Sequence, residues 1–357
     1  MRVGAWRRPG RVIAYGVAGV LIAAGSVLTA PAARAATGIP LLDPPKVIAT
    51  IPVGDGPSGV AMNAISGRVY VVNRDDDSVS VINPSDNSVI ATIPTAVSPD
   101  HLVVNPLSGR VYVLASNFRG TTPDRSYVQV IDPSSNAVTA TITIGFHGRD
   151  IAFNQLSGKI YVPIKSYANP REQGKVQVID PNSNTITATI PVGGLDPEGI
   201  AVNSVTGAVY VSDSQADTVQ VIDPISNKVT ATIPVGDYPR AITVSPLGRV
   251  YVSNNDGNSM SVIDPLTNKV AATIPVGQAP IGSAVNPLTS QVYVTNSGGG
   301  DTPGSNTDTV AIIDPLTNTV STYIPTGDYP DDVDVNPLTG RAYVTNFGSN
   351  TVSVIGK

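Results

Sequence analysis

The stretch Val229–Asn268, VTATIPVGDYPRAITVSPLGRVYVSNNDGNSMSVIDPLTN, contains four short runs with the composition of β-strands. Val229–Val235 alternates apolar and polar residues with a period of two, which is typical of a half-buried strand. The runs Ala241–Val244, Arg249–Ser253 and Met260–Ile263 are rich in β-branched residues and Tyr, which pack well on a pleated surface. Four such runs joined by Pro, Gly and Asn turns predict one antiparallel sheet.

The same pattern recurs along the chain. Self-similar units of about 40 to 50 residues, each with four strands, are the signature of β-propeller blades. The sequence therefore predicts an all-β, seven-bladed β-propeller built from four-stranded antiparallel blades. Counterparts of Val229 begin at Val47, Val89, Val138, Ile186, Val270 and Val320, with successive spacings of 42, 49, 48, 43, 41 and 50 residues.

The two ends of the repeat region predict how the ring closes. The region opens with a run of the VTATIPV type, Lys46–Gly54, and ends with a run of the MSVI type, Thr351–Ile355. We expect the N-terminal run to complete the last blade, because closure leaves no exposed strand edge. The propeller is predicted to span residues 46–357, preceded by a short linker over residues 36–45.

Residues 1–35 have the composition of an export signal. Several Arg precede the apolar stretch Val12–Ala30, and the small-residue site Ala33-Arg34-Ala35 follows it. This order predicts a secretory signal peptide cut near Ala35, and hence a secreted or cell-surface-associated protein. An uncleaved membrane anchor is the alternative, because the apolar stretch is close to spanning length. The pair Arg7-Arg8 leaves open a twin-arginine export signal.

The remaining composition narrows the possible partners. Beyond residue 35 the chain has 17 Lys+Arg and 27 Asp+Glu, a net charge of about −10 with His neutral. This charge repels nucleic acid and anionic lipid on average, so we expect no nucleic-acid partner and no stable membrane span after signal cleavage. The absence of Cys excludes disulfides and thiolate metal sites. We expect a monomer held together by packing and strand pairing.

The repeats carry a recognisable signature. Tyr293-Val-Thr-Asn and Tyr343-Val-Thr-Asn occur at the same repeat position, and Tyr251-Val-Ser-Asn is a near variant. Together with the IPVG-x-x-P and VIDP-x-T-N segments, they make the chain resemble the YVTN-type β-propeller repeat family from Lys46 to the C-terminus. The resemblance implies a propeller that is commonly exported or surface-associated. It implies no single activity, since similar propellers include lactone-hydrolysing enzymes, antibiotic lyases and surface-layer components.

Residues that recur at equivalent positions of the repeat are expected to serve the frame. One Tyr per repeat should pack between blades, and an Asp before Pro should accept hydrogen bonds from its own turn. The run Asp75-Asp76-Asp77 is either a solvated loop or a calcium loop. The recurrent Tyr are Tyr70, Tyr112, Tyr161, Tyr210, Tyr251, Tyr293 and Tyr343. The Asp-Pro turns begin at Asp132, Asp180, Asp223, Asp264 and Asp314.

Variation between the copies is concentrated on one expected face of the ring. The connections from outermost to innermost strand and from second to third strand share this face in a propeller, and the Asn-Pro and Asp-Pro turns lie on the other. Long connections are predicted at Ser116–Ser126, Lys165–Gly174 and Ser297–Thr307. Binding residues tend to lie on variable loops carried by a rigid scaffold.

Charged residues follow the recurrent Pro at the start of the innermost strands, where we expect the mouth of the central channel. A concave mouth lined by acids, bases and imidazoles is a candidate ligand site. The residues predicted to bind a ligand are Asp100, Arg149, Asp150, Arg240, Asp331 and Asp332. In a catalytic alternative, the set is His101, His147 and Glu198, with either His as general base and Arg149 or Arg240 stabilising an oxyanion. Asp100, Asp150 and Glu198 are then expected to orient the His or to hold a divalent cation.

The function predicted from these features is an exported binding or interaction module. Its expected partner at the loop-rich face is a small polar ligand, a glycan or a protein. A hydrolase or lyase acting on a small ester or lactone at the same mouth is the alternative, and a solvated charge ring without a ligand is a third interpretation. No cofactor and no metal site are predicted, although a divalent cation such as calcium or magnesium stays open.

Overall fold

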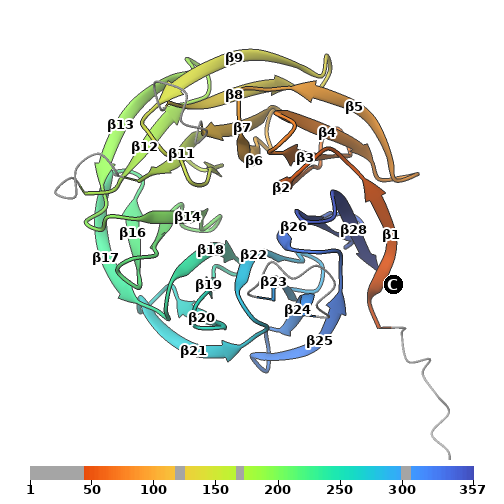
Figure 1. Cartoon of the computed structure of the whole chain (residues 1–357). Coiled ribbons are helices and arrows are strands. Elements are labelled where there is room, and N and C mark those ends of the chain that lie inside the picture. The colour runs from red at the N-terminus through yellow and green to blue at the C-terminus, as the bar shows by residue number, and fades with distance from the viewer. Residues whose placement is uncertain (1–43, 117–124, 166–172, 299–306) are drawn as a thin grey trace, which may run out of the picture. The chain divides into compact units, whose positions relative to one another are not determined.

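The computed structural model describes residues 44–116, 125–165, 173–298 and 307–357, which contain 28 β-strands and no helix. The strands form seven four-stranded antiparallel sheets that surround a central channel as blades (Figure 1). The predicted all-β, seven-bladed propeller is confirmed. Nothing in the described ranges forms a helix long and apolar enough to cross a membrane. The predicted signal peptide and most of the predicted linker lie outside the described residues.

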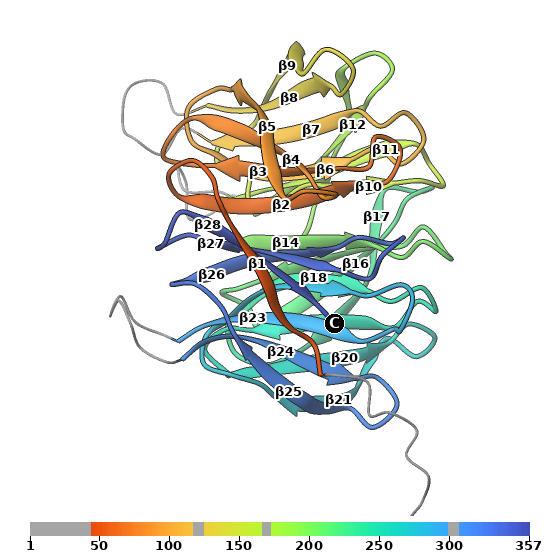
Figure 2. The ribbon, with the colours of Figure 1, turned by 90° about the vertical axis from the view of Figure 1, so that its right-hand side faces the viewer.

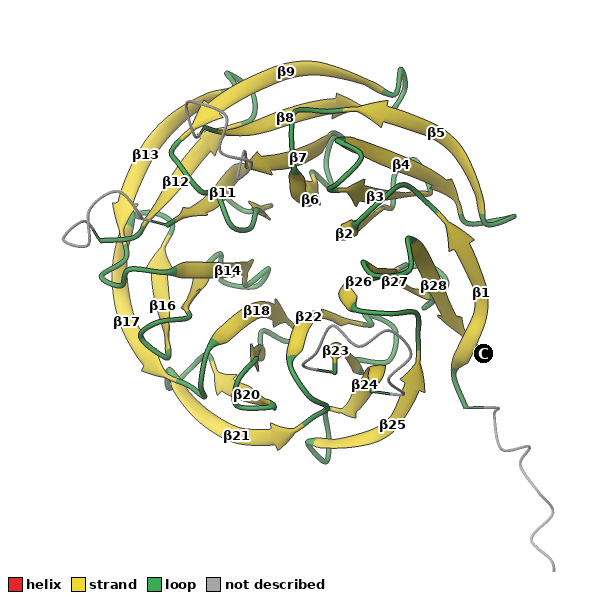
Figure 3. Cartoon of the chain, in the orientation of Figure 1, coloured by secondary structure: helices red, strands yellow, loops and turns green. Residues whose placement is uncertain are grey.

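Each blade has an inner, a second, a third and an outer strand, all connected by loops and turns (Figure 3). The inner strands are β2 (Pro57–Asn63), β6 (Pro99–Val104), β10 (Ala152–Asn154), β14 (Pro197–Val202), β18 (Pro239–Val244), β22 (Pro280–Val285) and β26 (Pro330–Val335). The second strands are β3 (Arg68–Asn73), β7 (Val111–Ser116), β11 (Lys159–Ile164), β15 (Val209–Asp213), β19 (Val250–Asn254), β23 (Val292–Ser297) and β27 (Ala342–Asn346).

The two remaining positions of each blade complete the set. The third strands are β4 (Ser78–Asn83), β8 (Ser126–Asp132), β12 (Lys175–Asp180), β16 (Thr218–Asp223), β20 (Ser259–Asp264), β24 (Asp308–Asp314) and β28 (Thr351–Gly356). The outer strands are β5 (Ser88–Pro94), β9 (Ala137–Ile144), β13 (Thr185–Pro191), β17 (Lys228–Pro234), β21 (Lys269–Pro275), β25 (Thr319–Pro325) and β1 (Lys46–Pro52).

The ring closes through its first strand. The last sheet has the order β1-β28-β27-β26, so the N-terminal strand is the outer strand of the seventh blade. β1 runs antiparallel to β28, with Ile51 opposite Val352 and Lys46 opposite Gly356. This pairing confirms the predicted closure, and it covers the β28 edge that would otherwise be exposed.

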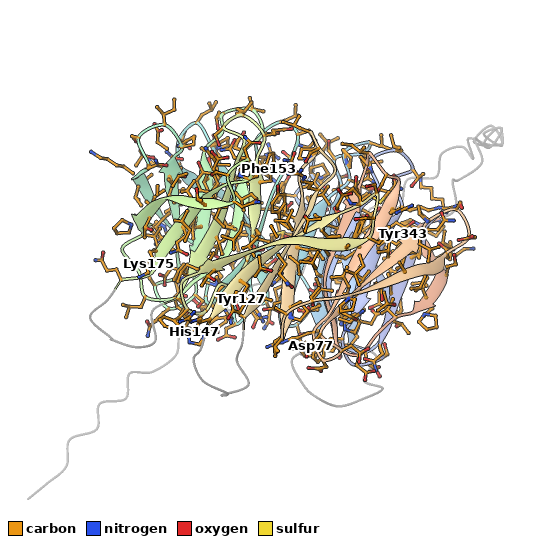
Figure 4. All side chains as sticks on the ribbon, turned by 90° about the horizontal axis from the view of Figure 1, so that it is seen from above. Asp77, Tyr127, His147, Phe153, Lys175 and Tyr343 are labelled. Carbon is orange, nitrogen blue, oxygen red and sulfur yellow. The ribbon has the colours of Figure 1, made fainter. Side chains whose placement is uncertain are left out.

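The connections divide between two faces of the ring. We call the face with the inner-to-second and third-to-outer turns the turn face, and the face with the other connections the loop face. Turns of consecutive blades touch on the turn face, where Asn63 Nδ2 donates to the Gly109 carbonyl at 2.7 Å and Asn154 Nδ2 to the Gly207 carbonyl at 2.9 Å. Figure 2 shows the strands crossing between the two faces, and Figure 4 shows Asp77 and His147 together at the loop face.

The residues of the YVTN segments have separate structural roles. Tyr293 is buried among apolar residues of blades six and seven. Thr295 donates its hydroxyl to the Asp331 carbonyl of the next blade at 2.8 Å, and Asn296 Nδ2 donates to Thr309 Oγ1 at 3.3 Å in the third strand. In this blade the Thr hydroxyl therefore joins the second strand to the inner strand of the next blade. The recurrent Tyr are all buried, which confirms their predicted packing role.

The Asp-Pro turns also behave as predicted. Asp264 Oδ1 accepts a hydrogen bond from Leu266 N at 2.8 Å, and Asp223 Oδ1 accepts one from Ile225 N at 2.7 Å. The residue after the Pro of each of these turns projects into solvent. Leu266 and Ile225 are each 92% exposed. Exposed aliphatic side chains of the turn face are Ile65, Leu107, Leu156, Val205, Leu247, Leu288 and Leu338 in the inner turns, and Ile225, Leu266 and Leu316 in the outer turns.

Charge is distributed unequally between the two faces. The turn face has more Lys and Arg than Asp and Glu. The other described acids lie on the loop face or in the channel. The acids of the turn face are Asp86, Asp132, Asp180, Asp223, Asp264 and Asp314. The Lys and Arg of its turns and adjoining strand ends are Lys46, Arg68, Arg110, Lys159, Lys228, Arg249, Lys269 and Arg341. The average negative charge of the chain therefore does not describe the turn face.

Candidate functional site

A cavity of about 1130 Å³ lies inside the ring. Its lining extends from Asp328 and Tyr329 on the loop face to Ser204, Pro246 and Pro287 on the turn face. The middle of the wall is apolar, because the inner strands contribute Val, Ile and Ala there. Charged side chains gather at the loop face, where these strands begin. The cavity is therefore a channel with one charged mouth.

Most of the predicted site residues meet at this mouth. Eight of the nine line the cavity: Asp100, His101, Arg149, Asp150, Glu198, Arg240, Asp331 and Asp332. They come from the second, third, fourth, fifth and seventh blades, so only ring closure brings them together. The structure adds four charged lining residues that were not predicted: Arg74, Asp308, Asp328 and Asp334.

His147 is the exception among the nine. It is not part of the cavity lining, and it has a left-handed backbone with a φ of 55°. Its carbonyl accepts a hydrogen bond from Lys165 N at 3.1 Å, so it belongs to the frame of the third blade. The residue that follows is Gly148 in place of Pro. A Cβ at Gly148 would lie 2.7 Å from Leu114 Cδ1, which explains the small residue.

Two of the arginines at the mouth, Arg149 and Arg74, form ion pairs with carboxylates. Arg149 Nε donates to Glu198 Oε2 at 2.9 Å, and its Nη2 donates to Oε1 at 2.8 Å. Such a two-point contact is the strongest geometry for an arginine and a carboxylate. Arg74 Nη1 lies 3.7 Å from Asp100 Oδ1. Burial alone would raise the pKa of Asp100, but His101 and the nearby arginines outweigh it and hold the pKa below its usual value.

His101 lies between carboxylates. Its Nδ1 is 3.8 Å from Asp150 Oδ1, and 34% of its side chain is exposed. Burial alone would lower the pKa of His101, but Asp100, Asp150, Asp332 and Asp331 outweigh it and raise the pKa above 6.5. A larger fraction of His101 is therefore protonated at neutral pH than in a free imidazole. In this state His101 is suited to donate a proton.

Three carboxylates of the channel wall join neighbouring inner strands. Asp332 accepts hydrogen bonds from Val60 N at 3.0 Å and from Val333 N at 2.8 Å. Asp334 accepts one from Met62 N at 2.7 Å, and Asp150 accepts one from Ile200 N at 2.9 Å. In each case the acceptor blade precedes the donor blade around the ring. These carboxylates therefore stabilise the ring in addition to lining the channel.

The same carboxylates are difficult to ionise. Burial raises the pKa of Asp332 to about 7, although His101 and two backbone N–H groups favour the charged form. Burial also raises the pKa of Asp334 to about 6 and moves the pKa of Asp150 and Asp331 upward. Since several acids share a narrow channel, a positive charge bound there would lower these pKa values.

The preceding blade holds the backbone of two charged residues of the mouth, Asp100 and Arg240. Ser58 Oγ donates to the Asp100 carbonyl at 2.8 Å, and Ser212 Oγ donates to the Arg240 carbonyl at 2.6 Å. Gly199 is required beside this contact, because a Cβ there would overlap the Arg240 carbonyl oxygen. The backbone at the mouth is therefore rigidly held.

The signal for Asp334 was present in the sequence. It occupies the fourth position after Pro330, where the blades before it have residues such as Ala61 and Thr243. A lone carboxylate at an apolar strand position is a departure from the repeat, and only the comparison of aligned inner strands reveals it. Arg74 had no comparable signal, because it follows the second strand in a connection whose length varies between blades.

Two carboxylates of the candidate cation site over residues 75–77 accept hydrogen bonds from backbone N–H groups of neighbouring loops. Asp76 Oδ2 accepts a hydrogen bond from Asp55 N at 2.8 Å, and Asp77 Oδ1 accepts one from Ser98 N at 2.8 Å. Among the residues that the structure describes, no group of three or more His, Cys, Asp or Glu is arranged to hold a metal ion. The three predicted long connections lie largely outside the described residues, which exclude 117–124, 166–172 and 299–306.

The fold and the channel define the class of protein as a β-propeller. No protein-family model matches the sequence, and no curated protein matches it significantly. A solved structure with the same fold is hydrazine synthase from Kuenenia stuttgartiensis. It is 18% identical, has a TM-score of 0.70, and the match covers 85% of this chain and 96% of that chain. Similarity at this level of identity concerns the fold alone.

Proposed function

We propose that this chain is an exported, YVTN-type β-propeller that binds a small polar ligand carrying positive charge at the loop-face mouth of its channel. One observation carries the proposal: the acids of the cavity outnumber its arginines. The lining contains Asp100, Asp150, Glu198, Asp308, Asp328, Asp331, Asp332 and Asp334, against Arg74, Arg149 and Arg240. The arginines are near carboxylates already, so the excess charge at the mouth is negative.

The wall chemistry bears on a cationic ligand in two further ways. Burial raises the pKa of Asp332 and Asp331, so binding of a cation would be coupled to the release of protons from the channel. Tyr329 and Phe347 line the same cavity and pack edge to face, with ring centroids 6.0 Å apart. Aromatic rings beside carboxylates are suited to ammonium and guanidinium groups. A ligand with an amine or guanidine head therefore fits better than a sugar or an anion.

Calorimetric titration with small probes tests this proposal. Agmatine and spermidine are the cationic probes, and glutarate and glucose are the anionic and neutral ones. We expect heat of binding for the cationic probes alone. The variant Asp331→Asn should weaken agmatine binding by roughly tenfold, because one carboxylate of the mouth loses its charge.

The matched control is Asp256→Asn, an exposed loop-face carboxylate outside the cavity lining. It removes the same charge and should leave agmatine affinity within about twofold, because exposed charges are screened by solvent and salt. Binding of glutarate with no binding of agmatine would reverse the proposed charge preference. Equal losses from the two variants would mean that the net charge of the protein, and not the mouth, attracts the probe.

The hydrolase or lyase alternative has one observation in its favour. His101 faces Asp150, and its pKa is raised. In such an enzyme His101 would act as the general acid that protonates a leaving group, with Asp150 keeping the imidazole charged. Loss of turnover on small lactones in His101→Gln, with an unchanged melting temperature, would favour this function. Retained turnover in that variant would exclude His101 as the acid.

Export and surface location rest on the composition of residues 1–35. Expression of the full chain in a bacterial host with a functional export pathway tests them. The expected product lies outside the cytoplasm and begins near residue 36. An intact N-terminus in the membrane fraction would indicate the anchor, and an intact cytoplasmic product would contradict export.

A further inference from the structure

Arg240 differs from the other two arginines that line the cavity, because it has no carboxylate partner. Arg149 donates two hydrogen bonds to Glu198, and Arg74 Nη1 lies 3.7 Å from Asp100 Oδ1. The Arg240 guanidinium forms no ion pair and donates no hydrogen bond within the part of the chain that the structure describes. Its N–H donors are therefore available in the cavity.

The missing partner follows from the residue that each blade has after its recurrent Pro. Asp100 and Glu198 both occupy the first position after this Pro, in the blade that follows the blade of their arginine. The blade that follows Arg240 has Ile281 at this position, which is 7% exposed. The blade before Arg240 has Glu198, but both oxygens of its carboxylate already accept hydrogen bonds from Arg149. Neither neighbouring blade therefore supplies a carboxylate to Arg240 at the equivalent position.

Arg240 is held close to the acids of the mouth without being bonded to them. Its carbonyl accepts a hydrogen bond from Ser212 Oγ at 2.6 Å, which fixes the backbone from which the side chain extends. Burial raises the pKa of Asp331, and Arg240 is the neighbouring charge that opposes this effect most. The mouth thus presents a guanidinium without a partner beside a carboxylate. A ligand with both signs of charge can contact both groups.

We propose that the ligand of the mouth carries a carboxylate in addition to its positive charge, as a basic amino acid does, and that Arg240 binds this carboxylate. The inference rests on the proposed function, since it specifies the class of cation that the same mouth binds. A guanidinium binds a carboxylate through two parallel N–H···O bonds, the geometry that Arg149 shows with Glu198. The acids of the mouth attract the amine or guanidine of the ligand, and they repel an anion that lacks one. A basic amino acid therefore fits better than a diamine, although the diamine has more positive charge.

Calorimetric titration with arginine, argininamide and agmatine tests the inference. Arginine and its amide differ only in the carboxylate, and agmatine is the cationic probe of the proposed function. We expect arginine to bind the unaltered protein about tenfold more tightly than argininamide, because only arginine can form the charged contact with Arg240. In Arg240→Gln the affinity for arginine should fall by about tenfold, whereas the affinity for argininamide should stay the same or rise. The comparison of the two probes on the unaltered protein does not depend on the folding of any variant.

The matched control is Arg110→Gln, which removes the same charge from an exposed turn-face residue outside the cavity lining. It should leave the preference for arginine over its amide unchanged. Binding of agmatine without a preference for arginine over argininamide would overturn this inference and leave the proposed function standing. Equal losses of arginine and argininamide affinity in Arg240→Gln would also overturn it, because the lost contact would not involve the carboxylate. Binding of none of the three probes would overturn both the inference and the proposed function.

Discussion

Arg149 and Glu198 form a two-point ion pair across the gap between blades three and four, with donor–acceptor distances of 2.9 and 2.8 Å. Glu198 is almost fully buried, with 7% of its side chain exposed, whereas Arg149 retains 20%. The two residues are 49 positions apart, and each begins an inner strand region of its own blade. The pair therefore joins two neighbouring blades and does not lie within one sheet.

Breaking this pair should destabilise the ring. In Arg149→Met the Glu198 carboxylate remains buried without a cation, and we expect a loss of about 3 kcal/mol in the free energy of unfolding. The double variant Arg149→Met, Glu198→Met should recover most of this loss, because no unpaired charge remains. Urea unfolding of the two single variants and the double variant measures the coupling. Additive losses would mean that the two side chains do not interact.

The Ser or Thr hydroxyl that follows the Tyr-Val pair should contribute to stability only in blades where it forms a hydrogen bond with the next blade. Ser212 Oγ donates to the Arg240 carbonyl at 2.6 Å and accepts from Gly199 N at 2.8 Å. We expect Ser212→Ala to cost about 1 to 2 kcal/mol of stability, because buried polar groups lose their partner. The matched variant is Ser253→Ala in the next blade, whose Oγ is buried without a hydrogen-bond partner among the described residues.

For Ser253→Ala the same urea measurement should give no loss, or a small gain, because an unsatisfied hydroxyl is removed from a buried site. Thermal unfolding of the two variants side by side provides a second check. A larger loss in Ser253→Ala than in Ser212→Ala would contradict the assigned role of the contact between blades.

Stability should fall as the pH rises through neutrality. The folded-state pKa of Asp332 is about 7, against an ordinary value of 3.8 for an aspartate in the unfolded chain, so the folded protein binds more protons than the unfolded chain between these values. The contribution of Asp332 to the free energy of unfolding is then largest below about pH 4 to 5, and it decreases as the pH rises to about 7. His101 acts in the same direction above pH 6.5, because its pKa is raised.

We expect the free energy of unfolding to fall by on the order of 2 kcal/mol between pH 5 and pH 8. In Asp332→Asn the slope should be smaller, although the variant is less stable at pH 5 because Val60 N or Val333 N loses an acceptor. Asp100 has a lowered pKa and adds stability that is lost only in stronger acid. An unfolding free energy that rises from pH 5 to pH 8 would contradict the protonation of Asp332.

Binding of a cation should show the opposite pH dependence. A positive charge in the channel favours the ionised carboxylates, so agmatine affinity is expected to rise from pH 5.5 to pH 8 by about tenfold. Calorimetry in buffers of different ionisation enthalpy should detect proton release near pH 6.5. Uptake of protons on binding would contradict the role assigned to Asp332 and Asp331.

The sequence alone determined the repeat, the number of blades and the strand that closes the ring. Each of these follows from local periodicity, and the turn residues fix where each strand ends. It also predicted eight of the residues at the channel mouth, because a position aligned by the repeat keeps the same place in every blade. The role of the Asp-Pro turns could also be predicted from the sequence, because their hydrogen bonds are formed between residues within four positions of each other.

Only the tertiary structure decided how the mouth residues are used. Asp332 and Asp334 bind the backbone of the first blade, and this contact exists only once the ring has closed. The same closure buries carboxylates from distant repeats in one channel, and this burial raises their pKa. His147 lies outside the cavity lining, because whether a side chain faces the channel depends on the backbone direction in its own blade, and the repeat does not encode that. Arg240 and Asp331 occupy equivalent positions and have opposite charges, because in both residues the preceding blade holds the backbone carbonyl while the side chain is left to the channel.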